Sequence, residues 1–288
     1  MKGVILAGGL GTRLSPLTNV VCKQLLPVYD KPMIYYPLST LILAGVTEVL
    51  VVSSPTEIGS FEKLLGSGEK FGISISYMVQ ENPIGLANGV AITQDWVAGE
   101  SFWFILGDNL FHGPDFGKHL SNIDDKGAHI FAAVVDDPRA YGVVVFEGDS
   151  PKQLVEKPAE PVSNWAIPGL YKFDSGVFEY CKNITPSPRG EFEIIDLLQA
   201  YLIANELKVT KVSRGNAWFD LGTFEQLLRG AQFVQMIEER QGLLVGSPEE
   251  AAVRMGRLGI KEILTVLDGA RAPYVESLIK SLNDAQEF

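Results

Sequence analysis

Cysteine and histidine are both scarce in this sequence. It has two cysteines, Cys22 and Cys181, and three histidines among 288 residues. Two cysteines are too few for a disulfide framework, so we expect a protein of a reducing compartment, the cytoplasm. No histidine lies near Cys22 in the sequence to act as its base, which argues against a cysteine nucleophile. The histidines also lack the close helical pairing of common zinc sites.

Positive charge and long apolar runs are limited as well. The formal net charge is -11 at pH 7, which argues against sequence-independent binding to nucleic acid or to an anionic membrane, because both depend on clustered Lys and Arg. The longest apolar stretches, residues 38–46 and 49–52, are far shorter than the roughly 20 residues that span a bilayer. We therefore expect neither a nucleic-acid partner nor a membrane partner, and an anionic ligand would need a local positive site.

Hydrophobic residues make up 46% of the sequence and charged residues 20%, which is enough apolar material for one large domain. Short apolar runs alternate with amphipathic stretches, a rhythm typical of strands joined by crossover helices. The pattern predicts early strands at 3–7, 48–53, 74–80 and 102–106, and helices at 32–44 and 85–97. Later strands are expected at 130–135, 143–146, 153–155 and 169–173, and later helices at 191–206 and 223–240.

The predicted fold is therefore α/β and Rossmann-like, with a mixed, mainly parallel sheet flanked by helices. We place the main domain at residues 1–240 and a C-terminal helical appendage at 241–288. Ser247-Pro248-Glu249-Glu250 is typical of a helix start, with Pro at the first helical position and acids in the first turn. The sequence contains no long Gly/Ser linker, so we expect the appendage to pack on the main domain or on a partner subunit.

A glycine-rich loop, LAGGLGTRL at residues 6–14, follows the first predicted strand. Its glycines let backbone N–H groups approach an anion closely, and Arg13 offers a rigid fork of donors for phosphate. The Walker pattern is absent, and the dinucleotide fingerprint would need a glycine where Leu14 stands. The loop thus suits a triphosphate, although these residues alone also fit a plain strand-to-helix turn with a surface arginine.

Two aspartates follow apolar segments. Asp108 lies in LGDN at 106–109 and Asp220 in AWFDLGT at 217–223. Because ligands gather at the carboxyl ends of strands in open α/β sheets, both could meet in one cleft. Mg²⁺ is usually held by one or two protein carboxylates together with substrate phosphates and water, so the pair fits a magnesium site. Taken singly, each aspartate is more typical of a helix cap or a turn.

Several longer strings connect these features: GGLGTR at 8–13, KQLLP at 23–27, DKPMIYYP at 30–37, LGDN at 106–109, YGVV at 141–144, EKP at 156–158, RGE at 189–191 and EERQGL at 238–243. Together they resemble the signature of the glucose-1-phosphate thymidylyltransferases, a family of sugar-1-phosphate nucleotidyltransferases. The resemblance covers nearly the whole chain. It implies a fold of the nucleotide-diphospho-sugar transferase type, with residues 1–240 as a catalytic domain that includes a sugar-binding subregion.

The resemblance implies nucleotidyl transfer from dTTP to glucose 1-phosphate, with dTDP-glucose and pyrophosphate as products. It implies Mg²⁺ bound by Asp108 and Asp220, and Arg13, Lys23 and Lys157 as catalytic residues. The nucleotide site would comprise Gly8, Gly9, Gly11, Thr12, Arg13, Lys23, Gln24, Gln80 and Gly85. The sugar phosphate would lie against Tyr141, Gly142, Glu156, Lys157, Ile167 and Trp218.

The same resemblance implies the first step of dTDP-L-rhamnose or related dTDP-deoxysugar biosynthesis. It also implies a homotetramer with a second nucleotide site at a subunit interface, where dTDP-L-rhamnose would inhibit. The implied reaction needs no general base, because a phosphate monoester with a second pKa of about 6 is already largely dianionic at neutral pH. Alignment and charge neutralisation would then provide the catalysis.

Two alternatives stay open. The chain has NPIGLAN at 82–88 where the family often shows SPDGLAQ, and Leu221 follows Asp220 where the family often has threonine. A UTP-dependent glucose-1-phosphate uridylyltransferase shares the early loop and is the nearest alternative. A noncatalytic sugar-nucleotide sensor is the other, and the retention of the predicted catalytic and metal-binding residues argues against it.

Overall fold

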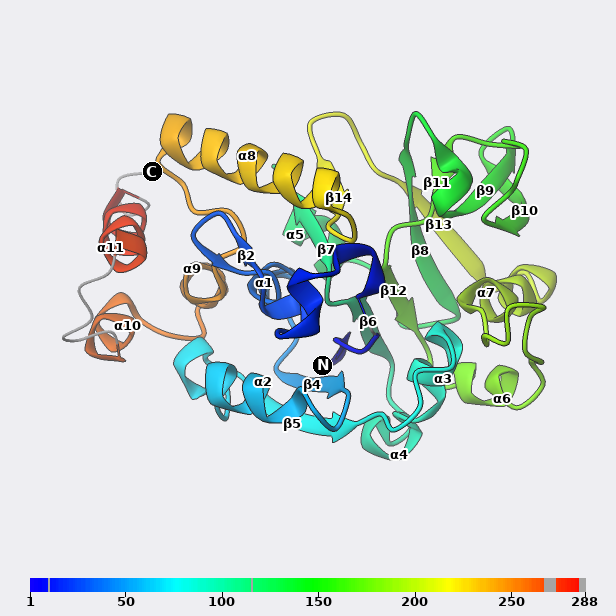
Figure 1. Ribbon diagram of the computed structural model, residues 1–288, viewed down its shortest axis with the longest axis horizontal. Coiled ribbons are helices and arrows are strands. Elements are labelled where there is room, and N and C mark those ends of the chain that lie inside the picture. The colour runs from blue at the N-terminus through cyan, green and yellow to red at the C-terminus, as the bar shows by residue number, and fades with distance from the viewer. Residues whose placement is uncertain (10, 115, 267–272, 285–288) are drawn as a thin grey trace.

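The computed structural model describes residues 1–9, 11–114, 116–266 and 273–284 (Figure 1). This part of the chain forms a ten-stranded sheet in the order β10-β9-β11-β8-β12-β6-β1-β4-β5, with β13 paired to β8. The strands are β1 Lys2–Leu6, β4 Glu48–Ser53, β5 Ser74–Val79, β6 Phe102–Leu106, β8 Ala128–Val134, β9 Gly142–Glu147, β10 Ser150–Glu156, β11 Trp165–Ala166, β12 Leu170–Phe173 and β13 Leu207–Lys211.

The sheet is parallel from β6 through β1 and β4 to β5, and largely antiparallel from β12 to β10. Parallel strands in the first half follow from the helical crossovers between them, whereas the short turns of the second half permit antiparallel neighbours. The predicted α/β class, a mixed sheet flanked by helices, is confirmed.

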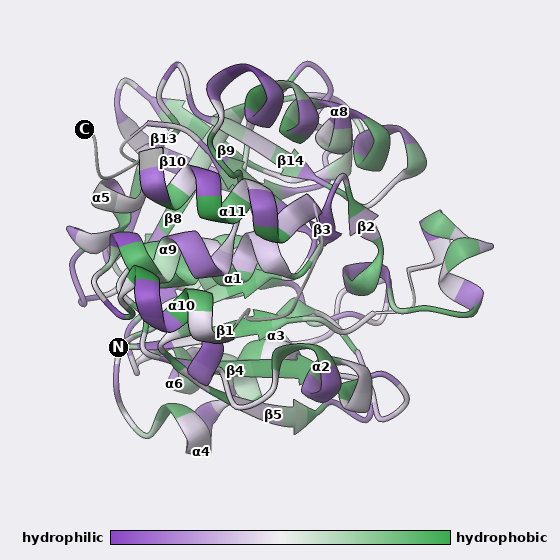
Figure 2. Ribbon diagram, turned by 90° about the vertical axis from the view of Figure 1, so that its left-hand side faces the viewer, coloured by the Kyte–Doolittle hydropathy of each residue, from purple (hydrophilic) through white to green (hydrophobic). Residues whose placement is uncertain are grey.

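Helices cover both faces of the sheet because successive residues of each strand point to opposite faces. Val4 and Leu6 pack on one face with the helices α3 Leu86–Ala91, α6 Val177–Cys181 and α7 Ile194–Ile203. Ile5 packs on the other face with α1 Tyr35–Leu43, α2 Ile58–Leu65 and α5 Phe116–Ser121. Figure 2 shows β1 and β4 as largely hydrophobic strands, as burial on both faces requires.

Two predicted helices differ from those observed. The helix expected at 85–97 is divided into α3 and α4 Gln94–Val97, and the Thr93 hydroxyl between them donates a hydrogen bond to the Val90 carbonyl at 2.7 Å. Such a side-chain bond competes with the helical backbone pattern. The helix expected from residue 32 begins at Tyr35, because Lys31–Pro32 forms strand β3, paired with β2 Pro27–Val28.

A separate two-stranded antiparallel ribbon brings polar residues of two distant segments together. Strand β7, Asn109–His112, continues from β6 and pairs antiparallel with β14, Ala217–Asp220. Asp220 lies opposite Asn109 in this register, and Trp218 lies opposite Phe111. The ribbon therefore brings two segments that are about a third of the chain apart into direct contact.

The C-terminal residues are helical, with α8 Phe224–Gln241, α9 Pro248–Arg254, α10 Ile260–Val266 and α11 Pro273–Asp284. The side chain of Thr223 caps α8 and that of Ser247 caps α9, as their sequences indicate. Helix α9 packs on α1, and its Ala251 belongs to the same hydrophobic core as Leu38 of α1. The boundary at residue 240 stays a prediction, and residues 267–272 and 285–288 of the predicted appendage lie outside the described residues.

Within the described ranges, the helices include none that is both long and apolar enough to cross a membrane.

The contrast between a buried and an exposed isoleucine generates a stability prediction. Ile105 is fully buried in β6, whereas Ile203 at the end of α7 is 75% exposed. We expect Ile105→Ala to lower the free energy of unfolding by about 2–5 kcal/mol, because it leaves a cavity in the core. The same substitution at Ile203 should change it by less than about 0.5 kcal/mol. Urea unfolding of both variants measures the difference, and equal losses would contradict the placement of Ile105 in the core.

Candidate active site

A cavity of about 610 Å³ lies where the polar residues that follow β1 and β6 meet the antiparallel half of the sheet. Its volume suits a small-molecule ligand. The predicted site residues that line it are Gly8, Gly9, Arg13, Lys23, Gln24, Asp108, Tyr141, Gly142, Glu156, Lys157, Ile167, Trp218 and Asp220. The predicted residues outside this lining are Gly11, Thr12, Gln80 and Gly85. The structure therefore brings both predicted halves of the site, nucleotide and sugar phosphate, into one cavity.

The glycine-rich loop needs its glycines for both conformation and space. Gly9 and Gly11 have φ values of +105° and +59°, which L side chains rarely adopt. A Cβ on Gly8 would lie 2.9 Å from Oε1 of Gln80, so Gln80 supports the loop from behind the cavity. The Thr18 hydroxyl donates to the Gly11 carbonyl at 2.9 Å and holds the turn that begins at Thr12. Gly11, Thr12 and Gln80 thus shape the loop from outside the cavity lining.

Asp108 and Lys23 form an ion pair inside the cavity. The Lys23 ammonium donates to Oδ2 of Asp108, and their side chains are only 12% and 11% exposed. Burial alone would raise the pKa of Asp108, but the neighbouring Lys23 charge and hydrogen bond outweigh it and lower that pKa. Asp108 is therefore a carboxylate near neutral pH, and its position after β6 points it into the cavity.

Asp220 reaches the same place from the end of β14. The Leu221 N–H donates to the Asp108 carbonyl oxygen at 2.9 Å, which holds the two segments together. Burial and the negative charge of Asp108 raise the pKa of Asp220 to about 6, although Arg13 and Lys23 act in the opposite direction. Two acidic groups in mutual repulsion are a favourable setting for a cation.

Gly222 lets Arg13 approach Asp220. A Cβ on Gly222 would lie 2.7 Å from Nη2 of Arg13 and 2.8 Å from Oδ1 of Asp220. A side chain at this position would separate the guanidinium from the carboxylate. The glycine that follows β14 is thus a requirement of the charge arrangement.

Asn109 links the two halves of the cavity, and the sequence pattern gave it no role. Its Nδ2 donates to Oδ1 of Asp108 at 3.0 Å. Its Oδ1 accepts from the Gly169 N–H at 3.0 Å and from the indole Nε1 of Trp218 at 2.6 Å. The side chain is 2% exposed, so these bonds form out of water. An amide directly after the strand-end Asp108 was the available signal.

Aromatic and aliphatic side chains form the far wall. The rings of Tyr141 and Trp218 meet edge to face with centroids 5.2 Å apart, and the Tyr141 hydroxyl accepts from Nε2 of Gln226 at 2.7 Å. A Cβ on Gly142 would lie 2.6 Å from Cδ1 of Ile195 and 3.2 Å from Oε2 of Glu156. Tyr141 and Trp218 are therefore fixed, and Gly142 leaves room between Ile195 and Glu156.

Two further cations lie at this end. Lys157 has a φ of +40°, an uncommon value for a residue with a side chain, and its ammonium lies 3.1 Å from Oε1 of Glu156. Arg189 also lines the cavity; its Nη2 is 2.8 Å from Oε1 of Glu193 and 3.3 Å from Oε1 of Glu156. The sequence analysis placed Arg189 only in a family string, because the contact joins two segments that are 33 residues apart.

Gly85 lies against the loop that carries Arg189. The Phe192 N–H donates to the Ile84 carbonyl at 2.8 Å, and the Ala87 N–H donates to the Phe192 carbonyl at 3.1 Å. A Cβ on Gly85 would lie 2.4 Å from the Phe192 carbonyl oxygen. Gly85 therefore joins the wall at 84–87 to the loop around Phe192, and its neighbour Leu86 lines the cavity.

The donor set suits a hard cation. The described residues contain no group of three or more His, Cys, Asp or Glu side chains placed to hold a metal ion. The cavity does offer the carboxylate oxygens of Asp108 and Asp220 beside space for a ligand. Mg²⁺ commonly binds through one or two carboxylates and completes its shell with phosphate and water oxygens, so these two residues fit it.

Cys22 does not act as a nucleophile in this arrangement. Its thiol lies 2.9 Å from Oε1 of Gln24, outside the cavity lining. Burial raises the pKa of Cys22 to about 11, despite the adjacent Lys23 charge, so the thiolate is scarce at neutral pH. This agrees with the prediction made from the lack of a neighbouring base.

The sequence matches the nucleotidyl transferase family over residues 2–236. It is 48% identical over 267 residues to the glucose-1-phosphate thymidylyltransferase of Mycolicibacterium smegmatis, covering 92% of this chain and 93% of the relative. A solved Bacillus anthracis protein assigned as a glucose-1-phosphate thymidylyltransferase, in complex with sucrose, superposes with a TM-score of 0.75 at 37% identity, covering 81% of this chain and 94% of that chain. A UDP-glucose pyrophosphorylase in complex with UDP-glucose is alike in fold, with a TM-score of 0.72 at 23% identity over 83% of this chain and 99% of that chain.

The close approach at Gly85 generates a prediction with a matched control. Gly85 and Gly45 both have positive φ, but a Cβ on Gly45 would meet no atom within 4 Å. We expect Gly85→Ala to lower the free energy of unfolding by about 2–4 kcal/mol, from strain and overpacking together. Gly45→Ala should cost about 1–2 kcal/mol from backbone conformation alone. Urea unfolding measures both, and equal losses would show that the Phe192 backbone does not limit this position.

Proposed function

We propose that this chain, which belongs to the nucleotidyl transferase family and within it to the glucose-1-phosphate thymidylyltransferases, transfers a thymidylyl group from dTTP to α-D-glucose 1-phosphate. The products would be dTDP-glucose and pyrophosphate. One observation carries the proposal beyond family membership: a single cavity is lined by the glycine-rich loop, the aspartates Asp108 and Asp220, and the cations Arg13, Lys23, Lys157 and Arg189. These groups suit two phosphorylated reactants side by side.

At the nucleotide end, we assign the triphosphate to the loop and its cations. The backbone N–H groups around Gly8 and Gly9 and the guanidinium of Arg13 would contact phosphate oxygens. Lys23 would stabilise the negative charge close to Asp108. Gln24 would face the base from the cavity wall, with Gln80 behind Gly8 and Gly85 beside Leu86 completing the nucleotide side. Gly11 and Thr12 would keep the loop in shape.

At the other end, we assign glucose 1-phosphate to the wall around β9 and β10. Lys157 and Arg189 would bind its phosphate, since both side chains carry a charge into the cavity lining. Glu156 is held by both cations, so its carboxylate is positioned to accept hydrogen bonds from sugar hydroxyls. Tyr141, Gly142, Ile167 and Trp218 would enclose the sugar ring.

Asp108 and Asp220 would hold the magnesium ion that the family resemblance implies. The ion would supply charge neutralisation for the phosphate oxygens of the bound reactants. The structural support is the pair itself: a buried and a half-buried carboxylate that repel one another, the buried one oriented by Asn109 and Lys23. Because Asn109 also bonds to Trp218, the same amide would align the metal site with the sugar pocket.

The proposed step is an in-line displacement. A phosphate oxygen of glucose 1-phosphate forms a bond to the α-phosphorus of dTTP, and the bond from that phosphorus to the leaving pyrophosphate oxygen breaks. The attacking oxygen carries no proton to remove, so the residues of this chain contribute alignment and charge stabilisation. This accounts for a cavity whose described lining contains Arg, Lys and Asp but no histidine.

The UTP-dependent alternative is weaker. The curated relatives at 44–48% identity that cover nine tenths of this chain are named glucose-1-phosphate thymidylyltransferases, whereas the likeness to UDP-glucose pyrophosphorylase is one of fold. A noncatalytic sensor is also disfavoured, because the predicted catalytic and metal-binding residues Arg13, Lys23, Asp108, Lys157 and Asp220 all line the cavity.

Three further features belong to this proposal. The reaction would be the first step of dTDP-L-rhamnose or related dTDP-deoxysugar synthesis in the cytoplasm. The protein would act as a homotetramer. A second nucleotide site at a subunit interface would bind dTDP-L-rhamnose as an inhibitor.

A nucleotide panel tests the proposed reaction. Purified protein with Mg²⁺ and glucose 1-phosphate is given dTTP, UTP, CTP, GTP or ATP in turn, and pyrophosphate release is measured. We expect dTTP to give the highest kcat/KM. A clear preference for UTP would establish the alternative enzyme, and tight binding of dTDP-glucose without turnover of any nucleotide would establish the sensor.

The aspartate pair generates a second prediction. We expect Asp108→Asn and Asp220→Asn each to lower kcat at least ~100-fold, because each removes a charge at the point where phosphate charge must be stabilised. Asp95 is exposed on α4, so Asp95→Asn provides the same chemical change away from the cavity and should keep normal turnover. Urea unfolding checks that all three variants fold. Near-normal rates in both cavity variants would refute the assigned role.

A further inference from the structure

Tyr141 is fixed in the cavity wall at its backbone, its ring and its hydroxyl. Its N–H donates to the Pro138 carbonyl at 3.0 Å, and its carbonyl accepts from the Lys157 N–H at 3.0 Å. Its ring lies edge to face against that of Trp218, and its hydroxyl oxygen accepts from Nε2 of Gln226 at 2.7 Å. Tyr141 is half-buried and lines the cavity, so its hydroxyl has a defined position in that wall.

Gln226 lies outside the described cavity lining, in the first turn of α8, three residues after the capping Thr223. Its backbone N–H donates to Oγ1 of Thr223 at 3.3 Å, and the Thr223 hydroxyl donates to Oε1 of Gln226 at 3.1 Å. Because Oε1 of the amide accepts from Thr223, the NH₂ group is the end that faces Tyr141. The cap of α8 therefore sets the direction of the Gln226 amide.

The direction of that amide determines where the Tyr141 proton can go. A phenol has one proton to donate, and here its oxygen already accepts from Gln226, so the proton must point elsewhere. Among the described residues, no group accepts a hydrogen bond from this hydroxyl. Burial and the negative charge of Asp220 raise the pKa of Tyr141, so the hydroxyl keeps its proton at neutral pH. Tyr141 is thus a donor without an acceptor in the described protein.

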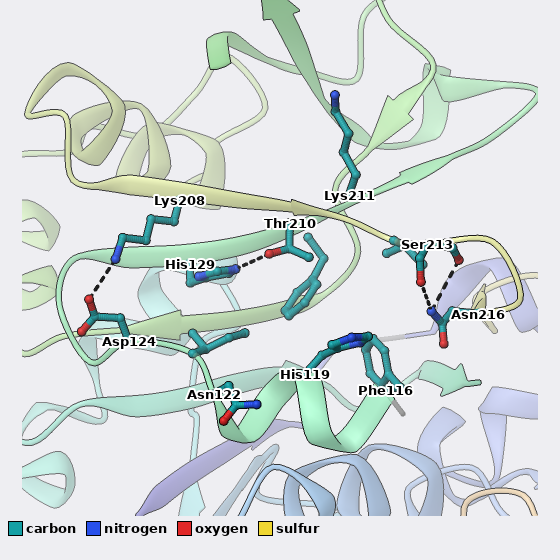
Figure 3. A pocket seen from close by; sticks show the side chains of 13 residues that line it. Phe116, His119, Asn122, Asp124, His129, Lys208, Thr210, Lys211, Ser213 and Asn216 are labelled. Atoms are coloured by element: carbon teal, nitrogen blue, oxygen red, sulfur yellow. Dashed lines mark hydrogen bonds and ion pairs between the residues drawn. The ribbon is translucent and has the colours of Figure 1, made fainter. Parts of the chain in front are cut away.

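The cavity of about 450 Å³ between α5 and the β8–β13 pair provides a contrast (Figure 3). The Lys208 ammonium in its lining is 2.9 Å from Oδ2 of Asp124. Nδ2 of Asn216 donates to the Ser213 hydroxyl oxygen at 2.6 Å. These donors are used within the protein, whereas the donor of Tyr141 stays available to a ligand.

We propose that Gln226 is a positioning residue of the active site, which holds the Tyr141 oxygen so that the phenolic proton is donated to an oxygen of the glucose moiety of the sugar phosphate. The inference rests on the proposed function, which assigns glucose 1-phosphate to this wall. Gln226 acts only through Tyr141. The bonds from Thr223 to Gln226 and from Gln226 to Tyr141 run in one direction, so each polarises the next donor.

Steady-state kinetics test the donor and its support. Tyr141→Phe removes only the hydroxyl, and Gln226→Met removes the amide with little change in size. We expect each to raise KM for glucose 1-phosphate about 3–10-fold, which corresponds to one neutral hydrogen bond. The contact is to the sugar and not to the reacting phosphates, so kcat and KM for dTTP should change less than about twofold.

The double variant separates positioning from packing. Since Gln226 acts through the Tyr141 hydroxyl, Gln226→Met should have no further effect on KM once Tyr141→Phe has removed that hydroxyl. A role of Gln226 in packing alone would survive the loss of the hydroxyl. In that case the double variant would show the product of the two single effects.

Gln235 provides a matched control on the same helix. Its Nε2 donates to Oε1 of Glu239 at 2.8 Å in an exposed position, and it lies outside the described cavity lining. Gln235→Met makes the same chemical change in α8 and should leave KM for both reactants normal. Urea unfolding checks that every variant is folded.

Calorimetric binding of dTDP-glucose gives a readout that needs no turnover. If the unchanged protein binds dTDP-glucose but turns over no nucleotide, the proposed reaction fails, while weaker binding by both single variants would still support this inference. Unchanged KM and unchanged dTDP-glucose affinity in Tyr141→Phe would overturn the donor role. Multiplied effects in the double variant would overturn the positioning role of Gln226. A protein that neither turns over nor binds dTDP-glucose would overturn both proposals.

Discussion

The placement of two carboxylates, buried Asp108 and half-buried Asp220, at the same end of one sheet is the constraint on which the rest of this structure depends. Asp108 and Asp220 disfavour each other's charge, and the chain as a whole is acidic. Cations from distant segments offset this negative charge. Lys23 lies beside Asp108, and Arg13 lies beside Asp220. Glycines in the loop and at Gly222 let these cations come close enough. The positions of these glycines and of the charged residues are therefore linked, because the charged groups can approach one another only where a glycine leaves room.

The β7–β14 ribbon explains how the cavity keeps its shape. It places Asp220 opposite Asn109, directly after Asp108. The Asn109 amide then connects Asp108, the backbone N–H of Gly169 directly before β12, and the indole of Trp218. Because all three bonds are buried, a displacement of any partner would leave an unpaired polar group, which is costly. These bonds therefore fix the position of Asp108 relative to Trp218, which lines the proposed sugar pocket.

The sequence by itself determined the α/β class, the early strands and several candidate site residues, among them Arg13, Asp108 and Asp220. Apolar runs predict β1, β4 and β6 because buried parallel strands must be apolar on both faces. The loop at 6–14 and the aspartates at strand ends could also be recognised from local sequence, because each follows an apolar segment. The break between α3 and α4 was not visible, since it accompanies a hydrogen bond from the Thr93 hydroxyl to the Val90 carbonyl.

Only the tertiary structure decided which of those residues meet. Arg189 and Glu156, Asn109 and Trp218, and Arg13 and Asp220 are far apart along the chain, and no periodicity relates them. It also decided that Gly85 approaches the Phe192 backbone and lies outside the cavity lining. Local pattern reports what a segment prefers, whereas contacts between segments depend on how the sheet orders its strands and where each loop returns. For this reason the chemistry could be read from the residues, but the geometry of the site could not.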